Sequence, residues 1–376
     1  MKQIIINGLI VMLVVCCAGC SDDDDKNPLG PGTGSSKIAV VNTSGDDEYN
    51  ISVINIETGE SYNDLVPLNG TSDMLQYGDD VYIVDKSGDR IIKFDPYKRV
   101  ITGEMSTGSK TAPNSITFAS AEKAYVPTSD VGYVTIINPS TMKVTGTIDI
   151  SSMADDDGDP DQGDAVIKGD RLYVALRRSS GRSLTDHSSL AVIDITSDTV
   201  IGELVLQTNG IAGSSKYSIG GQIRSSSTVA GSVYPYVIGS ITDIDDGAIE
   251  RVNIEEMTSE VILTEQAIGG NIAIWVFDTT TTGWAMAGLS ENYGGDGWGI
   301  MRFDLTTGSF EKVSDFQKHE LTRALDFTDD GLVLAGSLDE NNPGVFVYDS
   351  NNGYKPVFEQ AIDTGLLPWR ILCIRE

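Results

Sequence analysis

The stretch Ala124-Tyr-Val-Pro-Thr-Ser-Asp-Val-Gly-Tyr-Val-Thr-Ile-Ile-Asn-Pro-Ser-Thr-Met-Lys-Val-Thr-Gly-Thr-Ile148 decides the fold of this chain. It contains three short runs that are rich in β-branched and aromatic residues and are separated by Pro, Ser, Asp, Asn and Gly. Runs of this kind are typical of β-strands joined by tight turns. A fourth run, Ser115-Ile-Thr-Phe118, precedes them. The segment therefore predicts four consecutive strands that form one antiparallel sheet.

The same pattern recurs along the chain, and in each copy an Asp or Asn closes the middle run. Such a side chain can accept the backbone N–H two residues further on and so start the turn that follows. Successive markers lie at the spacing of a four-stranded propeller blade, about 40–50 residues, with two longer units. The seven markers are Asn55, Asp95, Asn138, Asp194, Asn253, Asp304 and Asp349. We therefore predict an all-β fold, a seven-bladed β-propeller over residues 37–376.

The two ends of the repeated region complement each other. The first unit begins directly with Lys37-Ile-Ala-Val-Val41 and has only three runs before Leu65. After the seventh unit the chain continues as Leu367-Pro-Trp-Arg-Ile-Leu-Cys-Ile-Arg375, a run with no unit of its own. We expect this C-terminal strand to complete the first blade, because a closed ring has no open strand edges.

The quoted stretch resembles the YVTN-type β-propeller repeat. Asp170-Arg-Leu-Tyr-Val-Ala175 and the run from Leu190 to Val200 are similar to it as well. The resemblance extends over residues 37–376 and implies the architecture. It does not imply an activity, because this fold carries enzymes, binding proteins and scaffolds alike.

The N-terminus has the features of a lipoprotein signal peptide over residues 1–19. Lys2 precedes an apolar run from Ile4 to Val15, which is too short to span a membrane. The ending Cys17-Ala-Gly-Cys20 resembles the lipobox of bacterial lipoproteins, although Cys17 stands where leucine is usual. This resemblance implies that Cys20 is lipidated. An ordinary secretory signal peptide is the alternative.

Residues 20–36 are predicted to be a tether, because they are acidic and then rich in Gly, Pro and Ser. The cluster Asp22-Asp-Asp-Asp25 resembles the surface-export signal of Bacteroidetes lipoproteins; a mere spacer is the alternative. The expected location is the cell envelope, on the outer membrane, facing the surface or else the periplasm.

Of the four cysteines, Cys373 alone would then keep a thiol, and its apolar neighbours predict a buried, inert one.

The composition of this chain limits the classes of partner and the kinds of activity that we expect. Fifty-five acidic residues against 26 basic ones give a net charge of -29, which makes nucleic acid and anionic membrane surfaces poor partners. The chain has only two histidines and lacks Gly-x-Ser-x-Gly and His-Glu-x-x-His motifs. We therefore expect a protein that is not an enzyme, and we expect it to be a monomer.

Connection lengths predict which face of the ring binds a ligand. Connections such as Gly78-Asp-Asp80 and the turns after the markers are short, so one face should be flat. The long segments all belong to the other face, where loops on a rigid scaffold commonly form binding sites. These segments are residues 151–164, 177–189, 207–219, 239–247 and 289–299.

Two groups of residues on these loops are candidate ligand contacts. Arg177, Arg178 and Arg182 suit carboxylate, phosphate or catecholate oxygens. Tyr293 and Trp298 could form flat apolar contacts to a ring or sugar. Salt bridges to neighbouring acidic residues and ordinary loop packing are the respective alternatives.

An aspartate-rich segment is a candidate metal site. Oxygen ligands at alternating positions suit calcium. The segment resembles the calcium repeats of thrombospondin type 3 and dockerin modules, but it lacks the bidentate Glu of an EF-hand loop. The candidate ligands are Asp155, Asp157, Asp159, Asp161 and Asp164. A solvated acidic loop is the alternative, and no other cofactor is indicated.

These observations favour a lipid-anchored binding protein of the cell envelope that captures a ligand on the long-loop face. Related Bacteroidetes propeller lipoproteins are associated with uptake of iron chelates. That resemblance implies outer-membrane uptake of a ferric chelate or another small molecule. The alternative is a scaffold that binds a basic envelope protein through its negative charge. A propeller enzyme is the third hypothesis.

Overall fold

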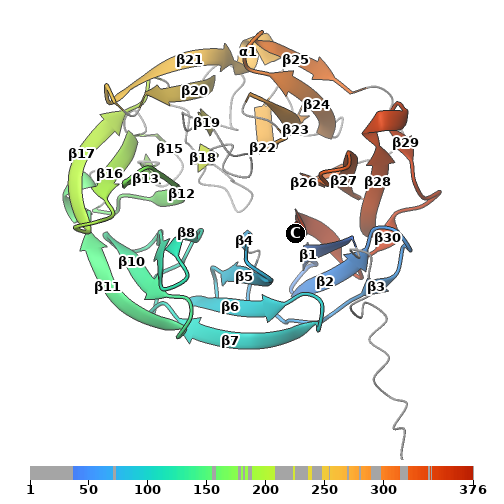
Figure 1. Cartoon of the computed structure of the whole chain (residues 1–376), viewed down its shortest axis with the longest axis horizontal. Helices are drawn as coiled ribbons and strands as arrows, with labels where there is room; N and C mark the ends of the chain where they lie inside the picture. Colours follow the sequence, from blue (N-terminus) through green and yellow to red (C-terminus); the bar gives the residue numbers. More distant parts are fainter. Residues whose placement is uncertain are drawn as a thin grey trace, which may run out of the picture.

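The structure is a computed structural model of the chain. It describes residues 37–375 except 71–72, 155–157, 177–178, 181–182, 185–188, 208–222, 225–235, 239–247, 254, 269–270, 279–280, 289–297, 314–320, 338 and 340. The described residues form seven antiparallel sheets of four or more strands, which stand as blades in a ring (Figure 1). The inner strands of four blades line a cavity in the centre of the ring, here called the central channel. The predicted seven-bladed β-propeller is confirmed.

Each blade has four successive positions from the channel outward, which we call A to D. The A strands are β31 (Leu367–Cys373), β4 (Asp73–Tyr77), β8 (Thr117–Ser120), β12 (Gln162–Lys168), β18 (Ile223–Arg224), β22 (Asn271–Phe277) and β26 (Leu321–Phe327), for blades one to seven. The B strands are β1 (Ile38–Ser44), β5 (Asp80–Asp85), β9 (Lys123–Val126), β13 (Arg171–Leu176), β19 (Tyr236–Ile238), β23 (Thr282–Gly288) and β27 (Leu332–Ser337).

The outer half of each blade follows the same order. The C strands are β2 (Tyr49–Asn55), β6 (Arg90–Asp95), β10 (Tyr133–Asn138), β16 (Ser189–Asp194), β20 (Ala248–Asn253), β24 (Trp298–Asp304) and β28 (Gly344–Asp349). The D strands are β3 (Ser61–Tyr62), β7 (Val100–Ser106), β11 (Lys143–Asp149), β17 (Thr199–Val205), β21 (Thr258–Thr264), β25 (Ser309–Lys312) and β29 (Lys355–Pro356).

A few elements lie outside this scheme. Strand β30 (Ile362–Asp363) also pairs with β28, and β14 (Ser179–Ser180) forms a small hairpin with β15 (Ser183–Leu184). Helix α1 spans only Glu265–Ile268. Among the described residues, no helix is long and apolar enough to cross a membrane.

The marker residues start turns as predicted. In all seven blades the side-chain oxygen of the marker accepts a backbone N–H from the second or third residue after it. Asn55, for example, accepts from Glu57 at 2.9 Å and from Thr58 at 3.0 Å. The marker therefore ends the C strand and directs the chain into the D strand.

Ring closure by the C-terminal strand is also confirmed. Strand β31 pairs with β1 and completes the first blade. Arg370 forms an ion pair with Asp73 of blade two at 3.6 Å, and Arg375 forms one with Asp326 of blade seven at 3.0 Å. The Cys373 N–H donates to the Asp326 carboxylate at 2.7 Å. The closing strand is thereby attached to both neighbouring blades.

The hydrophobic core lies between the blades. The buried apolar residues of the described chain form seven clusters, and each cluster joins two neighbouring blades. Cys373 belongs to the cluster between blades seven and one and is a buried thiol, as predicted. Burial raises its pKa well above the usual value, so it stays protonated at neutral pH.

Candidate functional site

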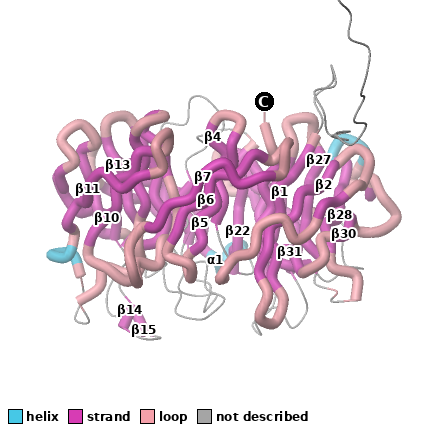
Figure 2. Tube along the Cα trace, turned by 90° about the horizontal axis from the view of Figure 1, so that it is seen from below, coloured by secondary structure: helices cyan, strands magenta, loops and turns pink. Residues whose placement is uncertain are grey.

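The two faces of the ring carry connections of different length. The A–B and C–D turns lie on one face, here the turn face, and are mostly short: residues 78–79 join β4 to β5, and 169–170 join β12 to β13. The B–C and D–A connections lie on the opposite face, here the connection face, and include all five segments predicted to be long. Residues 225–235, an A–B connection, are an exception to this division. Figure 2 shows the ring edge-on, with β14 and β15 on one face and the C-terminus on the other.

Most of the predicted contact residues lie outside the described residues. Arg177, Arg178 and Arg182 belong to the B–C connection of blade four, and Tyr293 to that of blade six. Trp298 is the first residue of β24, where its backbone pairs with Gly288 of β23; its side chain is outside the described part. Cys20 precedes the described residues as well. These assignments stay predictions.

The aspartate-rich segment is described only in part, because Asp155 and Asp157 lie outside it. The Asp159 carboxylate accepts the N–H of Asp161 at 3.0 Å, and the Asp164 carboxylate accepts that of Ala165 at 2.9 Å. No group of three or more Asp, Glu, His or Cys side chains arranged for a metal occurs among the described residues. The calcium hypothesis therefore rests on the sequence pattern alone.

The described part of the connection face contains a polar network around Lys86. Lys86 lies in the B–C connection of blade two and is half-buried. Its Nζ donates to Asn114 Oδ1 at 2.7 Å and to Ser129 Oγ at 3.0 Å. Ser129 belongs to blade three and Asn114 to the connection that leads into it, and both acceptors are neutral. The Lys86 ammonium group therefore bridges two blades.

Gln162 extends this network into blade four. It is the first residue of the inner strand β12 and is completely buried. Its side-chain Nε2 donates to the carbonyl oxygens of Val131 at 2.8 Å and Tyr133 at 3.0 Å, while the Gln162 backbone carbonyl oxygen accepts from Asn114 Nδ2. Because Asn114 lies three residues before the inner strand β8 and Gln162 begins the inner strand β12, the network sits at the rim of the central channel.

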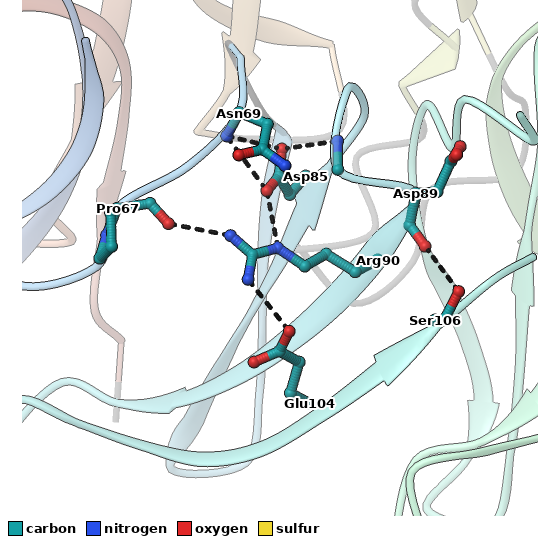
Figure 3. Close-up of polar contacts among 8 residues, drawn as sticks. Pro67, Asn69, Asp85, Asp89, Arg90, Glu104 and Ser106 are labelled. Atoms are coloured by element: carbon teal, nitrogen blue, oxygen red, sulfur yellow. Dashed lines mark hydrogen bonds and ion pairs between the residues drawn. The ribbon is translucent and has the colours of Figure 1, made fainter. Parts of the chain in front are cut away.

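A buried carboxylate beside Lys86 positions the connection that carries it (Figure 3). The Asp85 side chain is completely buried and accepts from Arg90 Nε at 2.8 Å and from the Gly88 N–H at 3.2 Å. Arg90 also donates to Glu104 of the D strand at 3.0 Å and to the carbonyl of Pro67 at 2.9 Å. Fixed hydrogen bonds on both sides hold the Lys86 backbone in one place.

A second carboxylate, Asp89, fixes the connection that brings Asn114. Its oxygens accept three consecutive N–H groups, from Lys110 at 2.7 Å, Thr111 at 2.8 Å and Ala112 at 2.9 Å. Lys110 and Ala112 have φ values of 58° and 45°, which turn these N–H groups toward one point. Burial by itself would raise the pKa of Asp89, but the hydrogen bonds outweigh it and lower the pKa. Asp89 is thus ionised at neutral pH.

Chemically, the network presents a positioned ammonium group together with amide and hydroxyl groups. Lysine binds carboxylate and phosphate oxygens as a compact point charge. Side chains whose own positions are fixed by neighbours lose little entropy on binding, which favours recognition. The rim around Lys86 is therefore suited to hold an anionic group.

Sequence reasoning missed these residues, although a signal was present. Lys86 and Ser129 each lie nine residues before a marker, Asp95 and Asn138, so they occupy equivalent positions in neighbouring repeats. Polar residues at equivalent positions of adjacent blades come close together around the axis. Alignment of the units on their markers would have paired these two residues.

Comparison with known proteins adds information on the fold. No family model and no curated protein matches the chain. The putative 6-phosphogluconolactonase of Bacteroides fragilis is 16% identical, with a TM-score of 0.60 over 92% of this chain and 100% of that one. The corresponding Bacteroides uniformis structure gives 14% and 0.59, over 91% and 100%. Citrobacter koseri AztD gives 11% and 0.53, over 91% and 98%. Such low identities show the β-propeller fold alone.

These comparisons contradict the prediction that the chain is not an enzyme. Structures with this fold include a streptogramin B lyase, a dihydro-heme d1 dehydrogenase and a hydrazine synthase. The prediction relied on few histidines and on missing local motifs. A propeller assembles its sites from residues of several blades, so the lack of a contiguous motif does not exclude catalysis. No particular reaction carries over at these identities.

Proposed function

We propose that this protein is a ligand-binding β-propeller of the cell envelope that captures a small anionic molecule on its connection face. The observation that carries the proposal is the Lys86 network, which joins three blades at the rim of the channel. The arginine-rich connection predicted to contact ligand belongs to blade four, the blade that supplies Gln162. Binding is the step that a carrier and an enzyme on this fold share, so the proposal is stated for binding.

We further propose that lipid on Cys20 attaches the chain to the outer membrane and that residues 20–36 act as the tether. The support is the signal-like N-terminus and its lipobox-like ending. In bacteria fed a labelled fatty acid, the wild-type chain should take up the label and fractionate with membranes. Cys20→Ser should lose both properties. Labelling of the Cys20→Ser variant would exclude this anchor.

The ligand class is tested by binding to the purified protein. The probes are ferric citrate, haem, citrate and inorganic phosphate, since the family resemblance points to iron chelates and the network to anionic oxygens. Binding should raise the melting temperature by mass action, and calorimetry gives the affinity. Each complex is also assayed for loss of the probe over time, so that turnover is detected if it occurs.

Two lysines on the connection face provide a matched pair of variants. Lys86→Met should weaken binding about tenfold or more, because a hydrogen bond to a charged group contributes about 1.5–3 kcal/mol. Lys110→Met removes the same charge from an exposed position on the same face and should leave the affinity unchanged. Equal affinities for wild type and Lys86→Met would overturn the proposed site.

A further inference from the structure

The central channel contains a cavity of 160 Å³, and none of its lining residues belongs to the Lys86 network. Its walls come from the inner strands β31, β4, β22 and β26, which belong to blades one, two, six and seven. This volume equals that of about five water molecules, and an engineered apolar cavity of about 150 Å³ is large enough to bind benzene. The cavity can therefore hold one small molecule.

The charged residues of the wall balance one another. Two arginines and two aspartates line the cavity, and they form the pairs Arg370–Asp73 and Arg375–Asp326. Both arginines lie on the closing segment, whereas each aspartate comes from a neighbouring blade. A purely anionic ligand would meet two carboxylates, and a purely cationic ligand would meet two guanidinium groups. A ligand with one charge of each sign matches this wall best.

Asp73 has the geometry to accept a further donor. Its side chain is 20% exposed, and its carboxylate lies 3.6 Å from Arg370 Nε. That separation exceeds the 2.7–3.2 Å range of a direct N–H···O hydrogen bond, so this pair is an ion pair without a direct hydrogen bond between these two atoms. A water molecule or a ligand donor that lies beside the pair can therefore contact the carboxylate as well. The charge-paired Arg370 beside it is 11% exposed.

The rest of the wall is apolar and accessible. Its accessible apolar residues are Leu75 and the half-buried Leu372, whereas Trp275, Phe277 and Phe327 border the cavity but expose only 0%, 4% and 6% of their surface. Leu75, on the inner strand β4, is 37% exposed, so solvent reaches this part of the channel. The site therefore combines a polar end for charged groups with an apolar surface for a short side chain.

We propose that this cavity is a second binding site, specific for a small zwitterion such as a free amino acid. The ammonium group lies against Asp73, the carboxylate lies against Arg370, and the side chain packs against Leu75 and Leu372. Because the ligand touches β31 and the blades on either side of it, binding also stabilises ring closure. The site is independent of the proposed function, which uses Lys86.

The test is calorimetric and thermal titration of the purified protein with the twenty free amino acids and with glycine betaine. At least one small apolar amino acid should bind and raise the melting temperature, whereas its amide and its N-acetyl derivative, which each lack one charge, should not. Asp73→Asn should weaken binding at least tenfold. Leu75→Trp should block the cavity while leaving both ion pairs in place.

Lys86→Met separates the two proposals, because it should leave amino-acid binding unchanged. Variants that unfold are identified by their melting curves without ligand, and Leu75→Met then serves as the mild substitution, with a smaller loss expected. The proposal is overturned if no amino acid or betaine binds, which would mean a water-filled cavity. It is equally overturned if binding persists in both Asp73→Asn and Leu75→Trp.

Discussion

The turn face and the connection face are formed by the same repeat, but the contacts made by their side chains differ. On the turn face, the fourth residue after every marker has a positive φ, between 50° and 75°. Only three of these seven residues are glycine. The positions are Gly59, Arg99, Met142, Asp198, Met257, Gly308 and Gly353.

The non-glycine residues at this position contact the preceding blade. The Arg99 guanidinium stacks 4.0 Å from the Tyr62 ring centre, and Asp198 accepts the Tyr125 hydroxyl at 2.6 Å. Met142 and Met257 lie against Gly103 and Gly202 of the preceding D strands. A strained backbone is therefore retained where a side chain joins two blades.

The connection face has no such common rule. Its described contacts, such as Asp85 with Arg90 and Lys86 with Asn114, occur in particular blades and are not repeated around the ring. Repetition on one face maintains the ring, while variation on the other allows different side chains to meet at the rim. Positions repeated in every blade therefore indicate residues that stabilise the ring, whereas positions that differ between blades indicate candidate binding sites.

Ring closure should have the largest effect on stability. Deletion of residues 367–376 removes the inner strand of blade one, together with the buried side chains of Ile371 and Cys373. Burial of each such side chain contributes about 1.5–3 kcal/mol, so these two account for a loss of about 3–6 kcal/mol, and no cooperative melting transition is expected. Deletion of Glu376 alone should leave the transition unchanged. An intact transition in the longer deletion would show that the ring does not need this strand.

Substitution of Asp85, the buried carboxylate of the connection face, should have the second largest effect on stability. Asp85→Asn leaves Arg90 beside a neutral partner and should cost about 2–3 kcal/mol, somewhat less than a fully buried pair because the Arg90 side chain is 23% exposed. Chemical denaturation measures the change. Glu104→Gln alters a partner of the same arginine that is 46% exposed, and it should cost below about 1 kcal/mol. Equal costs for both variants would mean that burial does not distinguish these contacts.

The sequence predicted most of the fold because the fold is local and repeated. The Asx markers, the short turns after them and the unmatched strand from Leu367 are visible in single segments, and each is confirmed. The site at the rim was not predicted, because its contacts join residues far apart in the chain. Lys86 and Ser129 are 43 residues apart, and Asn114 and Gln162 are 48 apart. Packing of neighbouring blades against one another brings such residues together.

Acidification should distinguish Asp89 from an exposed carboxylate such as Asp79. Hydrogen bonds lower the pKa of Asp89 below 3.8, so its contribution to stability is complete above the unfolded pKa and is lost as the pH falls through the folded pKa. Asp89→Asn should cost about 1 kcal/mol at pH 7 and progressively less below about pH 4. Melting curves between pH 2 and 7 test this. Asp79→Asn, at an exposed turn, should match wild type throughout, and a pH-independent cost of Asp89→Asn would contradict the role of its charge.

The smallest expected effect on stability distinguishes the backbone strain at Met142 from the side-chain contact that offsets it. Met142 has a φ of 50°, and its Cγ would lie 2.9 Å from a Cβ placed on Gly103 of the preceding blade. Met142→Ala keeps the strain and loses the contact, so it should cost about 1 kcal/mol. Met142→Gly loses the contact but relieves about 1 kcal/mol of strain, and should stay within about 0.5 kcal/mol of wild type. If Met142→Gly were clearly more stable than wild type, the Met142 side chain would not stabilise the contact between the blades, and nothing would offset the backbone strain at this position.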